Sequence, residues 1–135
     1  MGEDCKVENN VYDVYKCEKC GNIVEMLHAG FGELFCCKAP MVKLVENTTD
    51  AATEKHVPIV TRMSNGYEVK VGEVAHPMTE EHYIEWMELF IDGRTITKFF
   101  KPGEKPEWTY TCCQGKDVYA RVYCNLHGHW RSKRK

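Results

Sequence analysis

Apolar and polar residues alternate along short stretches in the second half of the chain. The run Tyr67-Glu68-Val69-Lys70-Val71 alternates strictly, and the turn residues Ser64-Asn65-Gly66 separate it from an apolar-rich run at 57–63. Two such runs joined by a short turn predict a β-hairpin.

Further runs of the same kind follow the hairpin. They predict strands at 83–91, 94–100, 108–113 and 117–124, with Asp92-Gly93 and Gln114-Gly115 among the intervening turns. Several short strands at this spacing predict an all-β, antiparallel sandwich or barrel. Residues 79–90 also allow a helix, because Thr79-Glu80-Glu81 is typical of a helix start.

The chain is expected to divide near residue 50, because a polar stretch at 46–54 separates two segments of different composition. The sequence therefore predicts one domain over residues 1–49 and a second over residues 50–135, with 46–54 as the linker. The first segment is too short to bury a sizeable core, and domains of this size need a disulfide, a metal or a partner subunit.

The charge of the chain is nearly balanced. The 135 residues include 18 Lys+Arg against 20 Asp+Glu, a formal net charge of −2, which argues against nucleic acid as the main partner. No apolar run approaches the length of a membrane span, and charged residues near the start do not fit a signal peptide. We therefore expect a cytoplasmic protein without a membrane partner, and a solvated basic tail at 131–135.

Eight cysteines and six histidines are many for a chain without an export signal, and they favour metal ligation over disulfides. Cys17 and Cys20 form a C-x-x-C turn followed by Gly21, which lets backbone N–H groups approach the sulfurs. Cys36 and Cys37 complete a set of four thiolates. Adjacent residues normally project to opposite sides, so we expect a strained backbone and a distorted tetrahedron there.

A second candidate set lies in the later segment. Cys124 ends a predicted strand and a tight turn separates it from His127, while His76 and His82 flank a short loop and His56 enters the first strand. Four imidazoles and one thiolate are more ligands than a structural zinc takes. They leave a sixth octahedral position open, and an open position on a redox metal indicates chemistry.

The first cysteine pattern resembles desulforedoxin and the N-terminal domain of desulfoferrodoxins. The resemblance rests on Cys17-Glu18-Lys19-Cys20-Gly21 followed by Cys36-Cys37, and it implies a mononuclear iron held by four cysteines. Residues 1–11 form an extension beyond the compact pattern, and Cys5 in it is expected to be a free thiol.

The second set, in its order and spacing, resembles the catalytic domain of superoxide reductase, as found in desulfoferrodoxin and neelaredoxin. The resemblance implies a second iron in each chain, an immunoglobulin-like β-sandwich, a homodimer, and reduction of superoxide to hydrogen peroxide with electrons from a rubredoxin-like donor. It assigns His56, His76, His82 and His127 as equatorial ligands and Cys124 as the axial thiolate. His127 should then bind through Nδ1.

Two charged residues beside His56 receive roles from the same resemblance. Lys55 can attract the superoxide anion and hold water for proton delivery, and Glu54 resembles the carboxylate that closes the sixth position when iron is oxidised. His28 and His129 are expected to be surface histidines. Cys112 and Cys113 are expected to pack as small apolar residues.

Two other functions fit parts of the sequence. One is a non-catalytic electron-transfer protein in which only the four-cysteine iron works, and the other is a binding module stapled by zinc. The five-ligand set with Glu54-Lys55-His56 favours the enzyme, and the missing spacer in Cys36-Cys37 disfavours the zinc module.

Overall fold

A computed structural model describes residues 8–49, 56–72 and 76–134, and every strand or helix assigned within these ranges is a β-strand. The all-β prediction is confirmed. No helix formed by the described residues is long and apolar enough to cross a membrane.

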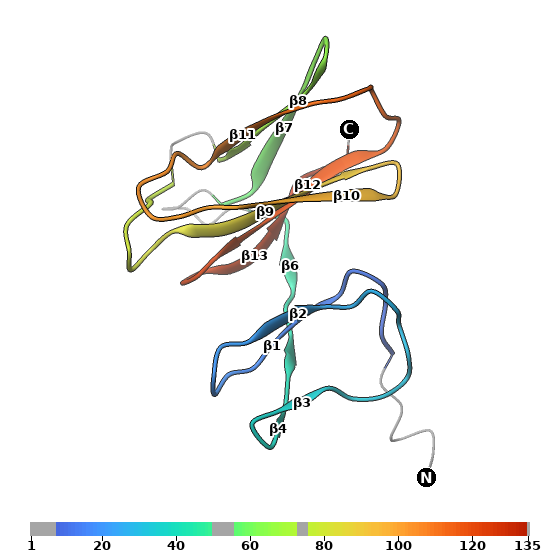
Figure 1. Cartoon of the computed structure of the whole chain (residues 1–135), viewed down its shortest axis with the longest axis vertical. Helices are drawn as coiled ribbons and strands as arrows, with labels where there is room; N and C mark the ends of the chain where they lie inside the picture. Colours follow the sequence, from blue (N-terminus) through green and yellow to red (C-terminus); the bar gives the residue numbers. More distant parts are fainter. Residues whose placement is uncertain (1–7, 50–55, 73–75, 135) are drawn as a thin grey trace. The chain divides into compact units, whose positions relative to one another are not determined.

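The chain forms two compact units, Met1–Leu44 and Val45–Lys135 (Figure 1). The domain boundary predicted from the sequence lies later, after residue 49. The difference arises at strand β6 (Glu46–Asn47), which was expected to be linker. It pairs with strand β13 (Gly128–Arg131) of the second unit, so these residues are ordered by the sheet they join.

The first unit is built from very short strands. Its three-stranded antiparallel sheet has the order β2-β1-β5, and its other two strands form a small hairpin. The bounds are β1 (Val14–Lys16), β2 (Ile23–Glu25), β3 (Phe35–Cys36), β4 (Ala39–Pro40) and β5 (Val42–Lys43). The buried apolar side chains described in this unit are Val14, Tyr15 and Cys17. So small a core needs a further constraint, which the cysteines can supply through a metal.

The second unit is a β-sandwich of two sheets, a five-stranded sheet in the order β10-β9-β12-β13-β6 and a three-stranded sheet in the order β11-β8-β7 (Figure 1). All pairs are antiparallel except β13 with β6. The remaining bounds are β7 (Pro58–Met63), β8 (Gly66–Val71), β9 (Ile84–Ile91), β10 (Arg94–Phe99), β11 (Glu107–Thr111) and β12 (Val118–Cys124).

The core lies between these sheets and follows the alternation seen in the sequence. The apolar positions of β8 and the predicted apolar face of β12 are both almost fully buried in one cluster. Residues 84–91 form a strand rather than the alternative helix, because β9 pairs with β10 on one side and β12 on the other while Met87, Leu89 and Ile91 face the core.

The predicted Asp92-Gly93 turn joins β9 to β10. Both residues have positive φ, 48° and 82°, as a type I′ hairpin turn requires. The Asp92 carboxylate also accepts hydrogen bonds from the backbone N–H groups of Lys116 and Asp117, so this turn anchors the loop that leads into β12.

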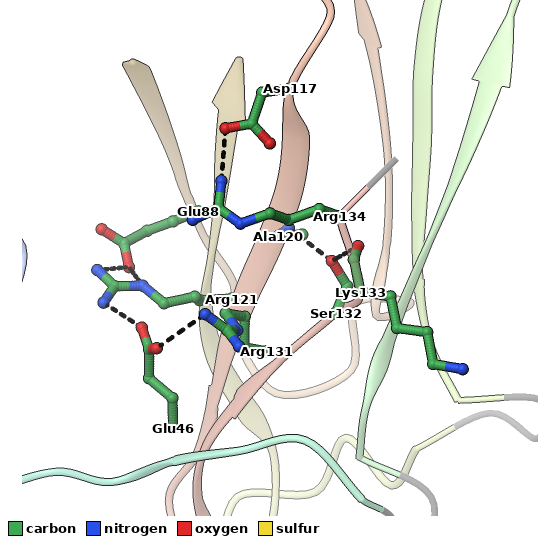
Figure 2. Close-up of polar contacts among 9 residues, drawn as sticks. All are labelled: Glu46, Glu88, Asp117, Ala120, Arg121, Arg131, Ser132, Lys133 and Arg134. Atoms are coloured by element: carbon green, nitrogen blue, oxygen red, sulfur yellow. Dashed lines mark hydrogen bonds and ion pairs between the residues drawn. The ribbon is translucent and has the colours of Figure 1, made fainter. Parts of the chain in front are cut away.

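A buried ion-pair network covers the outer face of the five-stranded sheet (Figure 2). The Arg121 guanidinium bonds Glu88 at 3.0 Å and 2.8 Å and Glu46 at 2.8 Å, and Arg121 and Glu88 are both buried. Glu46 belongs to β6, so this network also holds β6 against the sheet.

The C-terminal segment is more ordered than a solvated tail. Ser132 is buried and its hydroxyl accepts a hydrogen bond from the Ala120 N–H, while Arg134 pairs with Asp117 (Figure 2). The expectation for His129 was also wrong, since this side chain is 1% exposed. Burial, together with the positive charge of Arg121, lowers the pKa of His129 to about 3. Because β13 alternates its side chains, His129 lies on the face opposite to the core residue Trp130, with its ring 6.3 Å from that of Trp86, and its neighbours in the chain do not reveal this burial.

Candidate metal centres

The first unit brings its four predicted cysteines together. The ligand atoms of Cys17, Cys20, Cys36 and Cys37 all lie within 4.8 Å of one another. The sulfur of Cys36 is 3.6 Å from that of Cys20 and 3.9 Å from that of Cys37. Four sulfurs at these separations suit one tetrahedral iron or zinc ion.

The C-x-x-C turn supplies backbone donors to the sulfurs, as predicted. The Cys20 N–H points at the Cys17 sulfur at 3.5 Å, and the Asn22 N–H points at the Cys20 sulfur at 3.4 Å. Gly21 has a φ of 86°, a conformation that costs glycine little. Such donors stabilise negative charge on sulfur.

The adjacent pair Cys36-Cys37 adopts the strained backbone that its lack of a spacer predicts. Cys37 and the following Lys38 have φ values of 53° and 62°, in the left-handed region that non-glycine residues rarely occupy. The turn carries both sulfurs to the same side. Strain of this kind is held in place by the surrounding structure.

The protons of this cluster are distributed unevenly. A hydrogen bond from the Cys20 backbone is the main cause that lowers the pKa of Cys17 to about 6. Hydrogen bonding with the Cys20 sulfur is the main cause that raises the pKa of Cys37 to about 12. A metal that binds all four sulfurs must displace the protons that they carry.

The second unit gathers its predicted ligands at one end of the sandwich. His56 precedes β7, His76 follows β8, His82 precedes β9, and Cys124 is the last residue of β12. The ligand atoms of these four residues lie within 4.8 Å of one another. His127 joins them from the turn between β12 and β13, with its Nδ1 3.9 Å from the Cys124 sulfur.

The four imidazoles form a closed square. Neighbouring ring centroids are 4.7 Å apart for His56 and His76, 4.7 Å for His76 and His82, 5.0 Å for His82 and His127, and 4.9 Å for His127 and His56. The diagonal from His56 to His82 is longer, at 6.5 Å. The four rings surround a common centre with the buried Cys124 sulfur beside them, so the structure brings together the five residues that the sequence proposes as ligands.

The surroundings of two histidines indicate which ring nitrogen can face this centre. His76 Nδ1 lies 2.7 Å from the Pro77 carbonyl, which can only accept, so Nδ1 carries the proton and Nε2 carries the lone pair. His82 Nε2 is buried and has no hydrogen-bond partner among the described residues. Neutral imidazoles with one thiolate form a donor set that suits iron.

Exposure differs around the square. His56, His76 and Cys124 are buried, whereas His127 is exposed. His127 is therefore the most exposed of the five predicted ligands.

Asn125 connects the loop of His82 to the turn of Cys124. Its Oδ1 accepts from the Tyr83 N–H at 2.9 Å, and its Nδ2 donates to the Glu81 carbonyl at 3.0 Å. No role was predicted for Asn125 from the sequence. Its place in the turn between the ligands Cys124 and His127 is the sequence feature that points to one.

Other predicted residues lie outside the two centres. Glu54, Lys55 and Cys5 fall outside the described residues. His28 is exposed, as expected. Cys112 packs against the core, also as expected, but Cys113 is exposed, because β11 ends at Thr111 and the alternation of the strand stops there.

Comparisons with known proteins cover both units. The family model described as desulfoferrodoxin matches residues 48–133, and the model for the desulfoferrodoxin N-terminal domain matches residues 9–44. A desulfoferrodoxin of Nitratidesulfovibrio vulgaris is 56% identical over 124 residues, which cover 92% of this chain and 98% of that protein.

Two superoxide reductases are also similar. The protein of Pyrococcus horikoshii is 35% identical, over 69% of this chain and 96% of its own length. The crystal structure of the superoxide reductase from Treponema pallidum superposes with a TM-score of 0.72 at 29% identity, covering 90% of this chain and 97% of that one.

Proposed function

The chain belongs to the desulfoferrodoxin family, and on this premise we propose how its two centres divide the work of a superoxide reductase. The protein is an oxidoreductase that acts on superoxide and carries two irons, one with four cysteines and one with four histidines and a cysteine. The observation that carries the function is the square of four imidazoles beside the Cys124 sulfur.

The second unit is the catalytic domain in this proposal. The unit Met1–Leu44 would hold the four-cysteine iron, and the unit Val45–Lys135 would hold the catalytic iron. His56, His76, His82, His127 and Cys124 would hold the iron, which in its ferrous form would supply the one electron that superoxide needs, with two protons, to become hydrogen peroxide. The support for this assignment is that all five donors lie at one end of the second unit.

Cys124 controls the release of the product. Its thiolate would donate electron density to the iron and so would favour protonation and release of the product. Five protein donors would leave an octahedral iron one position for substrate.

Lys55 and Glu54 act at the open position, although both lie outside the described residues. Their place directly before the buried ligand His56 supports this assignment. The Lys55 ammonium attracts the superoxide anion and holds water for proton delivery. The Glu54 carboxylate would serve as a further oxygen ligand when the iron is oxidised.

The surroundings of the enzyme are part of the same proposal. A rubredoxin-like protein supplies the electrons, the chain forms a homodimer, and it acts in the cytoplasm. The donor and the homodimer are what the family resemblance implies, and the near-neutral charge of the chain agrees with a small-molecule substrate rather than a nucleic acid.

The variant Cys124→Ser tests the function, with Cys113→Ser as the matched control because Cys113 is exposed and lies outside both centres. Metal analysis, visible absorption and peroxide production with a chemical reductant are measured together. Cys124→Ser should lose the thiolate-to-iron absorption of the second centre and nearly all turnover, while Cys113→Ser keeps both. An active Cys124→Ser protein with an unchanged spectrum would exclude this centre as the site of reduction.

A further inference from the structure

Trp130 contacts two of the predicted ligands, His56 and His127, which are neighbours in the imidazole square. Its indole ring stacks on the His56 ring, with centroids 4.8 Å apart and planes 17° from parallel. Its Nε1 donates a hydrogen bond to the His127 carbonyl at 3.1 Å. One side chain therefore contacts the ring of one ligand and the backbone of the next.

The core fixes the position of Trp130. The residue lies in β13 opposite Val122, and both belong to the buried cluster between the sheets. Trp130 is 8% exposed, so its rotamer is restricted by packing on most sides. Packing between the sheets therefore restricts its orientation.

The two ligands that Trp130 contacts come from different sheets. His56 leads into β7 of the three-stranded sheet, and His127 leads into β13 of the five-stranded sheet. Backbone pairing within either sheet does not hold these two residues at a fixed separation. A rigid side chain that contacts both residues can hold them at a fixed separation.

Each contact restrains a different motion. A stacked indole limits the rotation of the His56 ring about its χ2 angle, a torsion that is broad in an unrestrained histidine. The hydrogen bond to the His127 carbonyl holds the turn that also begins at Cys124, and so limits the position of the Nδ1 side of His127. Partners outside the ligand set commonly orient metal ligands in this way.

We propose that Trp130 is a positioning residue that holds His56 and His127 in ligating geometry, and so sets how firmly the second centre retains iron. The proposal rests on the iron site described above. It adds to that site a residue that is not itself a ligand and does not touch the substrate.

Two substitutions separate the contacts. Trp130→Phe keeps an aromatic ring for stacking and removes the N–H donor, whereas Trp130→Leu removes both. Trp86→Phe is the matched control. The Trp86 ring is also stacked, with its centroid 4.6 Å from that of Tyr123, but its stacking partner is not a ligand of the second centre.

The experiment follows the transfer of ferrous iron from the full-length protein to a chromogenic chelator. The absorption of the four-cysteine centre in the same chain serves as an internal reference for protein amount and folding. The wavelength of the thiolate-to-iron absorption and the midpoint potential of the second centre are recorded for each oxidised variant.

Trp130→Phe should release iron from the second centre about tenfold faster than the unmodified chain and shift its absorption, and Trp130→Leu should release it faster still. Trp86→Phe should match the unmodified chain. If Trp130→Phe retains iron as the unmodified chain does, with the same band and potential, the proposal is overturned, and this holds even if Trp130→Leu fails to fold. If the unmodified chain itself holds no iron in the second centre, the proposed function fails instead.

Discussion

Asn125 and Tyr83 exchange two hydrogen bonds, one from the Tyr83 N–H to the Asn125 Oδ1 at 2.9 Å and one from the Asn125 N–H to the Tyr83 carbonyl at 3.2 Å. Tyr83 follows His82 and Asn125 follows Cys124. The pair therefore couples the loop of one ligand to the turn of another.

Removing the Asn125 side chain should loosen this coupling. Asn125→Ala leaves the Tyr83 N–H without its acceptor, so we expect a loss of about 1–3 kcal/mol in the free energy of unfolding. Iron should also dissociate more readily from the second centre. Denaturant titration and iron release check both effects, and Asn125→Asp, which keeps an acceptor for Tyr83, should lose less. Equal stability of Asn125→Ala and the unmodified chain would contradict the role.

The two iron centres should be separable by mutation, because they lie in different units with different ligands. Cys17→Ser should remove the spectrum of the four-cysteine centre and destabilise the first unit, whose core is small. Peroxide production with a direct chemical reductant should continue. A collapse of this activity would show that the second centre depends on the first.

Steering by Lys55 should appear in the first encounter with superoxide. Lys55→Ala should slow the second-order reaction several-fold, since one positive charge beside the open position is lost, and the loss should shrink as salt screens the field. Lys55→Arg keeps the charge and should react nearly as fast as the unmodified chain. Experiments with pulse-generated superoxide at several ionic strengths measure these rates. An unchanged rate in Lys55→Ala would mean that Lys55 is an ordinary surface charge without a role in steering. Glu54→Ala should keep the encounter rate but alter the absorption of the oxidised protein.

The buried pair of Arg121 and Glu88 offers a stability test (Figure 2). Arg121→Met leaves the Glu88 carboxylate buried without its main partner, and we expect a loss of about 3–5 kcal/mol. Changing both residues to Met should recover much of this loss. Arg134→Met breaks an exposed pair with Asp117 and should cost less than about 1 kcal/mol. Denaturant unfolding of the four proteins decides whether the desolvated charge is the cause, and a double variant as unstable as Arg121→Met would contradict it.

Acid should weaken the anchor at Asp92. The backbone N–H of Asp117 is the main cause that lowers the pKa of Asp92 below its ordinary 3.8, so its contribution is complete above that pH and is lost as the pH falls through the lower value in the folded protein. Asp92→Asn should therefore be less stable than the unmodified chain at pH 7, and the difference should narrow below pH 3.8. Parallel urea titrations at neutral and acidic pH check this. A difference independent of pH would mean that the charge does not matter.

Much of this architecture could be predicted from local sequence. Strict alternation in 67–71 and the apolar face of 118–124 specify strands with one buried side, because a strand alternates its side chains between two faces. The missing spacer between Cys36 and Cys37 likewise predicts the left-handed backbone seen at Cys37 and Lys38, since two adjacent side chains can point to one side only when the chain twists sharply.

The ligands of the second centre were identifiable by residue type and spacing, and the structure determined their arrangement. His76 and His82 flank one short loop, but His56 and His127 come from distant parts of the chain, so the closure of two sheets on one core defines the order of the square.

Tertiary structure alone decided the surroundings of that centre. His129 was expected at the surface and is buried, β6 joined a sheet where a linker was expected, and Trp130 came to lie against His56. Each outcome depends on which distant strand becomes a neighbour. Local patterns specify which face of a strand is apolar. What covers the opposite face depends on contacts between parts of the chain that are distant in sequence.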